Sequence, residues 1–214
     1  MIEKIYNAVL EFEIEEIVSY VEEAVNEGVN VKEILDNGLI AGLDEIGRLF
    51  SQGEIFVPEM LMAAHTMKAG MEVIKPYLKG DSQESRGTLI IGSVKGDLHD
   101  IGKNLVVMML EGGGFNVIDL GIDIDKQDFI KAAKENNADI IGLSALLTTT
   151  MPALDEAVQE IKKSGIDVKI MIGGAPVTQD FADKIGADGY SEDASGAVIL
   201  ARKLMKEKQN QIIA

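Results

Sequence analysis

The residues best placed to do chemistry are Asp97 and His99, which lie two positions apart in a segment flanked by Gly96 and Gly102. A histidine that binds a metal usually donates its other ring N–H to a carboxylate, which fixes the tautomer and raises the basicity of the ring. Asp97 is spaced to accept such a bond. A single imidazole cannot form a protein-only metal site, but it can be the axial ligand of a metal inside a macrocycle, as in haem proteins. On its own, the spacing is also typical of a structural hydrogen-bonded pair.

The composition restricts the other chemistry that is possible. The chain has no cysteine, which excludes disulfides, thiolate nucleophiles and cysteine-bound zinc or iron–sulfur centres. The chain has two histidines, and the other one, His65, lies in a helical pattern and is interpreted as a packing or surface residue. The net charge of −16 would repel a phosphate backbone, so no nucleic acid is expected as a partner. Without a membrane-span pattern or a secretory signal, we expect no membrane partner and a cytoplasmic location.

The first part of the chain has helical spacing of its apolar residues. One apolar stripe covers Ile14–Val25. Asn30 is the predicted N-cap of a helix that runs to Phe50, and Pro58 suits the first turn of the next helix. With a short helix at the start, these elements predict a four-helix bundle over residues 1–80.

The spacing of the apolar residues changes after a polar, glycine-flanked segment at residues 79–87. We assign residues 81–87 of this segment as a linker. From residue 88 to 214, short apolar runs alternate with helical stretches, which predicts an α/β domain with a parallel five-stranded sheet. The predicted strands are 88–93, 116–120, 139–143, 168–172 and 187–190.

The unusual residues follow three of these strands. They are Gly92–Gly102 after the first strand, Ser144–Thr150 after the third and Gly173–Gly174 after the fourth. Ligands of open parallel sheets bind beyond the carboxyl ends of the strands, and the flavodoxin-like order 2-1-3-4-5 places these three strands side by side. We therefore predict that order and one shared pocket. The segment after the second strand, Gly121–Asp125, is expected to offer less. No Gly-x-Gly-x-x-Gly follows the first strand, which argues against a dinucleotide site.

The chain resembles the cobalamin-binding domain of B12-dependent methyltransferases in three ordered motifs: Asp97-x-His99-x-x-Gly102, Ser144-x-Leu146 and Gly173-Gly174. The segment from Val94 to Leu105 is similar, nearly residue by residue, to that of methionine synthase. The resemblance covers essentially the whole chain, because in that family a four-helix cap precedes a Rossmann-like domain. At this length, the chain is most similar to the corrinoid proteins of methylamine, methanol and methoxyl methyltransferase systems.

The resemblance implies a role for each matching residue. His99 would displace the dimethylbenzimidazole of the cofactor and bind cobalt, Asp97 would accept its other ring N–H, and Thr150, a serine in methionine synthase, would extend this relay. The nucleotide tail would lie beside the sheet, where Gly173 and Gly174 leave room for it. The full set that the resemblance assigns to the cofactor is Phe56 (a shield for the upper face), Gly96, Asp97, Leu98, His99, Asp100, Ile101, Gly102, Ser144, Leu146, Thr148 (at the corrin rim), Thr150, Gly173, Gly174 and Tyr190.

The implied function is that of a carrier. Cobalamin would be bound base-off with His99 on, and a methyl group would pass from a substrate-specific methyltransferase to a second one, whose acceptor is tetrahydrofolate or coenzyme M. A reductive activator is an expected further partner, and residues 79–87 are a predicted hinge for cap movement. The alternatives are a B12-sensing regulator, which carries an added DNA-binding motif, and a mutase-type subunit, which usually lacks the cap. The sequence specifies neither the methyl donor nor the oligomeric state.

Overall fold

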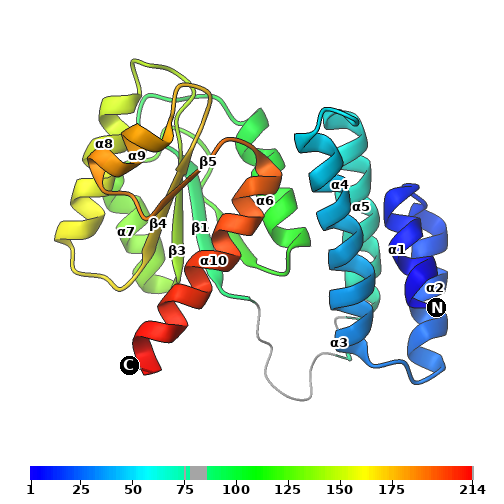
Figure 1. The fold of residues 1–214 in the computed structure, drawn as a ribbon. Coiled ribbons are helices and arrows are strands. Elements are labelled where there is room, and N and C mark those ends of the chain that lie inside the picture. The colour runs from blue at the N-terminus through cyan, green and yellow to red at the C-terminus, as the bar shows by residue number, and fades with distance from the viewer. Residues whose placement is uncertain (75, 78–85, 214) are drawn as a thin grey trace. The chain divides into compact units, whose positions relative to one another are not determined.

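The structure, a computed structural model, describes residues 1–74, 76–77 and 86–213 and divides into two compact units (Figure 1). One unit is built from the N-terminal helices and the other from a parallel sheet with its covering helices. The predicted hinge at residues 79–87 lies outside the described part of the chain, except for Arg86 and Gly87. The predicted domain boundaries at residues 80 and 88 therefore stay predictions.

The helical unit contains the elements predicted from the apolar periodicity. Its helices are α1 (Ile2–Leu10), α2 (Ile14–Asn26), α3 (Val31–Glu33), the π-helix η1 (Ile34–Ile40), α4 (Ala41–Ser51) and α5 (Val57–Ile74). The Asn30 side chain accepts a hydrogen bond from the Lys32 N–H at 2.8 Å, which confirms the predicted N-cap. The helix that follows Asn30 differs from the prediction, because its residues Ile34–Ile40 are π-helical rather than α-helical.

Two glycines allow α1 to lie close to the π-helix and α4. A Cβ atom on Gly38 would stand 2.9 Å from Ile5 Cγ2, and one on Gly42 would stand 2.8 Å from Val9 Cβ. Both distances are shorter than real Cβ contacts, so a larger residue at either position would push α1 away. The close packing buries Ile5 and Val9 completely and forms the core of this unit.

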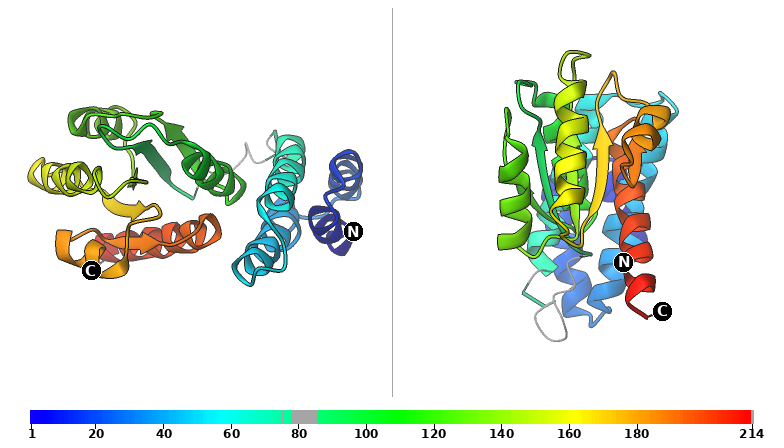
Figure 2. Two further views of the ribbon diagram at one scale, coloured as in Figure 1. Left: turned by 90° about the horizontal axis from the view of Figure 1, so that it is seen from above. Right: turned by 90° about the vertical axis from the view of Figure 1, so that its left-hand side faces the viewer.

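The second unit is a five-stranded parallel sheet with the order β2-β1-β3-β4-β5, which confirms the predicted flavodoxin-like order. Its strands are β1 (Thr88–Ser93), β2 (Asn116–Asp119), β3 (Ile140–Ser144), β4 (Lys169–Gly173) and β5 (Gly189–Ser191). Its helices are α6 (Ile101–Gly112), α7 (Lys126–Glu135), α8 (Met151–Lys163), α9 (Gln179–Ile185) and α10 (Ala194–Ile213). Helices α6 and α10 cover one face of the sheet, and α7, α8 and α9 cover the other (Figures 1 and 2).

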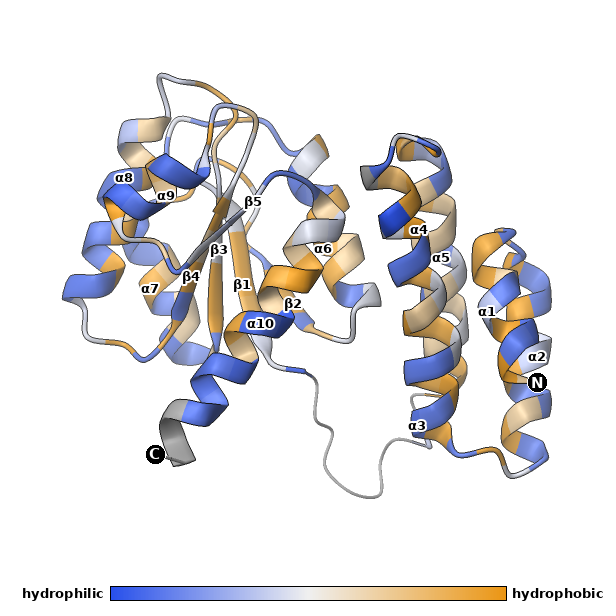
Figure 3. Ribbon diagram, viewed as in Figure 1, coloured by the Kyte–Doolittle hydropathy of each residue, from blue (hydrophilic) through white to orange (hydrophobic). Residues whose placement is uncertain are grey.

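The central strands are hydrophobic along almost their whole length, as Figure 3 shows for β1 and β3. Continuous apolar strands are typical of a parallel sheet whose two faces are both covered by helices. On one face, the fully buried ring of Phe129 on α7 packs over Gly92, where a Cβ atom would come within 3.0 Å of the ring. This sheet is the rigid base for the loops at its carboxyl edge. Within the described residues, no helix is both long enough and apolar enough to cross a membrane.

Candidate functional site

The sheet register brings the predicted segments to one edge. Ser93 at the end of β1 pairs with Ser144 at the end of β3, which pairs with Gly173 at the end of β4, which pairs in turn with Ser191 of β5. These residues form one row at the carboxyl edge of the sheet. The loops that leave the row from β1 and β3 carry the candidate polar residues.

Asp97 is the centre of the polar network in these loops. Its Oδ1 accepts hydrogen bonds from the His99 backbone N–H at 3.0 Å and from His99 Nδ1 at 2.8 Å. Its Oδ2 accepts from the Leu146 backbone N–H at 2.6 Å and from Thr150 Oγ1 at 2.8 Å. Thr150 stands at the N-terminus of α8, but its hydroxyl makes no helix-capping bond there and is used for Asp97 instead. The structure therefore brings together Asp97, His99, Leu146 and Thr150.

The network determines the protonation of the pair. Burial alone would raise the pKa of Asp97, whose side chain is 1% exposed. The hydrogen bonds from the Leu146 and His99 N–H groups, the Thr150 hydroxyl and the His99 ring outweigh burial and lower the pKa to about 2. Asp97 is thus ionised at neutral pH and can only accept, so Nδ1 of His99 carries the proton. In the neutral form of the ring, the lone pair is then on Nε2.

The His99 imidazole is 47% exposed and stands among exposed apolar side chains. Leu98 is 67% exposed on the same loop, Ile101 is 82% exposed at the start of α6, and Leu146 and Leu147 are exposed on the loop after β3. A group of exposed apolar side chains often marks a binding site, whereas a single exposed apolar side chain does not. No group of three or more histidine or acidic side chains among the described residues is arranged to hold a metal ion. The arrangement offers one exposed nitrogen ligand among loops that also expose apolar side chains.

Sequence reasoning missed two residues that contact this loop. The Ser93 hydroxyl donates to the carbonyl oxygen of His99 at 2.7 Å. Asp123, in the segment after β2, accepts from the Gly96 N–H through Oδ1 at 2.8 Å and donates its own N–H to the Asp97 carbonyl at 3.0 Å. The segment Gly121–Asp125, which was expected to offer less than the other segments, thus contacts the loop of His99 through Asp123. The only signal in the sequence was position: each residue ends, or closely follows, a strand beside the site.

The two glycines after β4 have different surroundings. Gly174 has a φ of +124°, and a Cβ atom there would lie 1.9 Å from the Ala145 carbonyl oxygen, so the backbone itself requires a glycine. A Cβ on Gly173 would meet only the Ser191 carbonyl, at 3.1 Å. The close approach of the loop after β3 is thus enough to explain why position 174 is a glycine. The predicted room for a ligand would be a second reason.

The other residues assigned to the cofactor lie around this edge or in the helical unit. Asp100, Gly102 and Thr148 are exposed, whereas Ser144 and Tyr190 are partly buried. A side chain on Gly102 would enter open space, at the first turn of α6. Phe56 belongs to the helical unit and is 67% exposed, and its backbone N–H donates to Glu59 Oε2 at 2.7 Å. The cofactor contacts predicted for these residues stay predictions.

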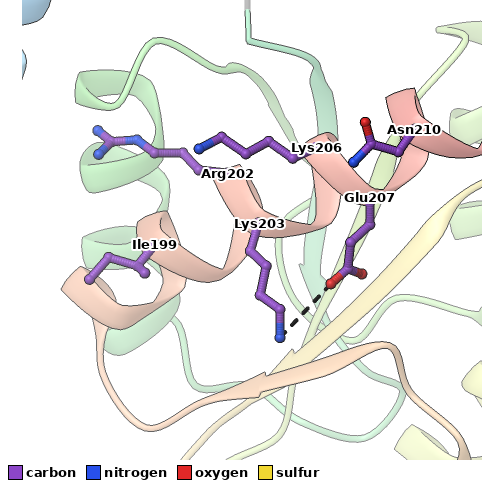
Figure 4. Close-up of a pocket in the computed structure, with 6 residues that line it drawn as sticks. All are labelled: Ile199, Arg202, Lys203, Lys206, Glu207 and Asn210. Atoms are coloured by element: carbon purple, nitrogen blue, oxygen red, sulfur yellow. Dashed lines mark ion pairs between the residues drawn. The ribbon is translucent and has the colours of Figure 1, made fainter.

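A separate hollow lies along the exposed face of α10 (Figure 4). Its lining residues are Ile199, Arg202, Lys203, Lys206, Glu207 and Asn210. Lys203 and Glu207 form an ion pair across one helical turn, at 3.9 Å. None of the residues predicted for the site lines this hollow, so the functional assignment depends on the loops at the strand ends.

Comparison with known families defines the class of the protein. The family model of the B12 binding domain matches residues 87–199, and a second model with the same description matches residues 1–75. Together they cover the sheet unit with its loop at His99 and the helical unit. The fold and the site thus define a B12-binding protein with a helical cap and a Rossmann-like domain.

Similar proteins narrow the class. The dimethylamine corrinoid protein 1 of Methanosarcina acetivorans is 44% identical over 208 residues, which cover 96% of this chain and 97% of that protein. The trimethylamine corrinoid protein 1 of the same organism is 44% identical over 209 residues, with the same coverage. In the solved methanol:cobalamin methyltransferase complex of Methanosarcina barkeri, the matching chain is 30% identical with a TM-score of 0.81, covering 100% of this chain and 84% of that one. This chain belongs to the corrinoid proteins of methyltransferase systems, and it carries a methyl group on a bound cobalamin.

The residues of the site fit that cofactor. The apolar side chains around His99 suit the face of a corrin ring, and the lone pair on Nε2 suits a metal that brings its other ligands with it. The space around the Cα of Gly102 is open, so a side chain of the protein does not fill it.

Proposed function

We propose that His99 is the lower axial ligand of cobalt, with the benzimidazole of the cofactor displaced. The observation that carries this proposal is the 2.8 Å contact between Nδ1 of His99 and an ionised, buried Asp97, which leaves Nε2 as the ring nitrogen for the metal. A carboxylate partner of this kind raises the basicity of a ligating histidine and fixes its orientation. Bound cobalamin supplies the chemistry of accepting and donating the methyl group at its cobalt.

The residues around Asp97 then control how strongly His99 binds. The N–H of Leu146 and the hydroxyl of Thr150 share the charge on Oδ2, so they lower the proton affinity of the carboxylate. A carboxylate with a low proton affinity leaves the proton on Nδ1 of His99 while Nε2 binds the metal. Whether or not Nε2 binds the metal, the Nδ1–H bond to Asp97 holds the ring in the same orientation. Thr150, Asp97 and His99 therefore act as a connected relay.

We also propose that the methyl donor is a methylated amine, delivered by a methyltransferase specific for it. Two relatives that match almost the whole chain are named for dimethylamine and trimethylamine, which supports an amine over methanol. The complex in the methanol system pairs a corrinoid protein with a methyltransferase, which supports such a partner here. An acceptor methyltransferase that uses coenzyme M or tetrahydrofolate, a reductive activator and a cytoplasmic location complete the proposal. Contacts of the nucleotide tail with Ser144, Gly173 and Tyr190, and shielding by Phe56, belong to it as well.

The ligand assignment is tested by electron paramagnetic resonance of the protein loaded with hydroxocobalamin and reduced to the Co(II) form. Protein made with isotopically labelled histidine is compared with unlabelled protein, because only a histidine ligand changes the nitrogen splitting when the label is introduced. We expect a label-dependent splitting in wild type and in His65→Ala, and none in His99→Ala. His65 is the control because it is an exposed histidine of the helical unit. A label-independent spectrum in wild type would show that no histidine binds cobalt and would overturn the assignment of His99.

The donor is tested by incubating the reduced, loaded protein with purified methyltransferases for trimethylamine, dimethylamine, monomethylamine and methanol. The visible spectrum reports methylation of the cofactor. We expect rapid methylation with one of the amine-specific enzymes. Methylation by the methanol enzyme alone would overturn the amine assignment, and isomerase activity with adenosylcobalamin would favour the mutase class.

A further inference from the structure

Two side chains outside the motif of the cofactor site hold the backbone of the turn that carries His99. Ser93 is completely buried at the end of β1, and its hydroxyl donates to the His99 carbonyl at 2.7 Å. The His99 N–H donates to Asp97 at 3.0 Å. The peptide groups on both sides of His99 are therefore fixed, although its imidazole is half exposed.

Asp123 holds the other end of the same turn. Its Oδ1 accepts from the Gly96 N–H at 2.8 Å, and its backbone N–H donates to the Asp97 carbonyl at 3.0 Å. Asp123 has a φ of +57°, in the left-handed region where aspartate and asparagine occur more often than most residues. A residue other than glycine stays in this region only when the surrounding structure holds it there. Such residues are found more often at functional sites.

The two holding residues belong to one hydrogen-bonded frame. The Ser93 N–H donates to the Gly121 carbonyl at 3.0 Å, and the Ile124 N–H donates to the Ser93 carbonyl at 3.0 Å. Ser93 thus connects the loop after β2 to the loop that carries His99. The buried Lys103 on α6 adds a 2.5 Å contact to Asp119 at the end of β2, which ties the helix after His99 to the same strand.

We propose that Ser93 and Asp123 are positioning residues for His99, which hold residues 96–99 in the ligating geometry before the cofactor binds. This inference rests on the proposed function, because it takes His99 as the lower ligand of cobalt. The hydrogen bonds that Ser93 and Asp123 make to this turn go to its backbone and not to the imidazole. A turn that is fixed in advance loses less conformational entropy when Nε2 binds the metal, so ligation by histidine is favoured over ligation by benzimidazole or water.

The variants Ser93→Ala and Asp123→Ala test the proposal in the loaded, full-length protein. Each removes a hydrogen bond to the backbone of the turn and leaves Asp97, His99 and Thr150 in place. We expect the ratio of histidine-ligated to other Co(II) protein, measured by the label-dependent splitting, to fall about threefold to tenfold in each variant. Ser93→Thr keeps a hydroxyl and Asp123→Asn keeps the acceptor for Gly96, so both should restore most of the ratio.

Matched controls remove similar groups elsewhere. Ser164→Ala deletes a hydroxyl that donates to the Ile161 carbonyl at 2.6 Å near the end of α8, and Asp128→Ala deletes an exposed carboxylate on α7. Both should keep the wild-type ratio. A second readout needs no cofactor: hydrogen exchange of the His99 amide, which is bonded to Asp97, should accelerate in both alanine variants and in neither control.

The outcomes separate the two proposals. If wild type shows no label-dependent splitting, the assignment of His99 as ligand is wrong. If wild type shows it, and both alanine variants retain the wild-type ratio and the wild-type exchange of the His99 amide, then Ser93 and Asp123 do not position the ligand. If an alanine variant fails to retain cobalamin, unchanged exchange of the His99 amide in the cofactor-free protein likewise refutes the inference.

Discussion

Replacement of Asp97 by asparagine tests the polar network at the centre of the site. In the structure the carboxylate accepts four hydrogen bonds, from the His99 N–H, His99 Nδ1, the Leu146 N–H and the Thr150 hydroxyl. An amide of the same shape offers one oxygen and one NH2 group. Whichever way it is turned, the NH2 group faces a backbone N–H, of either His99 or Leu146, and neither of these donors can reverse its role.

The cost follows from the number of bonds affected. One buried backbone donor is left without an acceptor, which costs about 1–3 kcal/mol, and the remaining bonds lose the strength that the charge gave them. We expect Asp97→Asn to lower the free energy of unfolding of the sheet unit by about 2–4 kcal/mol. With a urea dependence of about 2 kcal/mol/M, the midpoint of unfolding falls by about 1–2 M.

The assay is urea unfolding of the cofactor-free protein, in which the nuclear magnetic resonance signals of the β3 amides report the folded fraction. These amides report on the sheet unit, so unfolding of the helical unit does not enter the measurement. Asp128→Asn on the exposed face of α7 is the control, and its free energy of unfolding should stay within about 0.5 kcal/mol of wild type. A midpoint for Asp97→Asn that matches this control would refute the reasoning, because it would mean that the unpaired backbone donor and the lost charge cost no net stability.

Two further substitutions test neighbouring features. Gly174→Ala would place a Cβ atom 1.9 Å from the Ala145 carbonyl oxygen at a φ of +124°, so we expect a loss of more than about 3 kcal/mol of stability in the same urea assay; a small loss would show that the loop after β3 moves away easily. Thr150→Val removes the hydroxyl that donates to Asp97 at 2.8 Å, and we expect a loss of about 1.5–3 kcal/mol, most of it recovered in Thr150→Ser. Equal unfolding midpoints for the valine and serine variants would contradict a role of the hydroxyl.

The sheet order could be predicted because it follows from where the unusual residues lie. Placing the segments after the first, third and fourth strands in one pocket requires these strands to be adjacent, and the register of Ser93, Ser144 and Gly173 confirms it. The Asp97–His99 pair was also predictable, since a short spacing of complementary side chains limits the possible geometry.

The residues that hold the turn could not be predicted in this way. The contacts of Asp123 involve the backbone of Gly96 and Asp97, and backbone groups leave no trace in the residue pattern. The π-helical segment at 34–40 is hidden for a similar reason, because its apolar residues recur at a spacing that an α-helix would share. In both cases at least one partner of each deciding interaction is a backbone group, which every residue has.

The edges of the sheet have a consequence for how the protein behaves in a crowded solution. The outer strands β2 and β5 are four and three residues long. Unpaired edges of long, flat strands can recruit a strand from another molecule, and short edges limit this. Asp119 adds a charge at the end of β2, where it pairs with Lys103. The protein thus has little strand edge through which copies of itself could join into fibres.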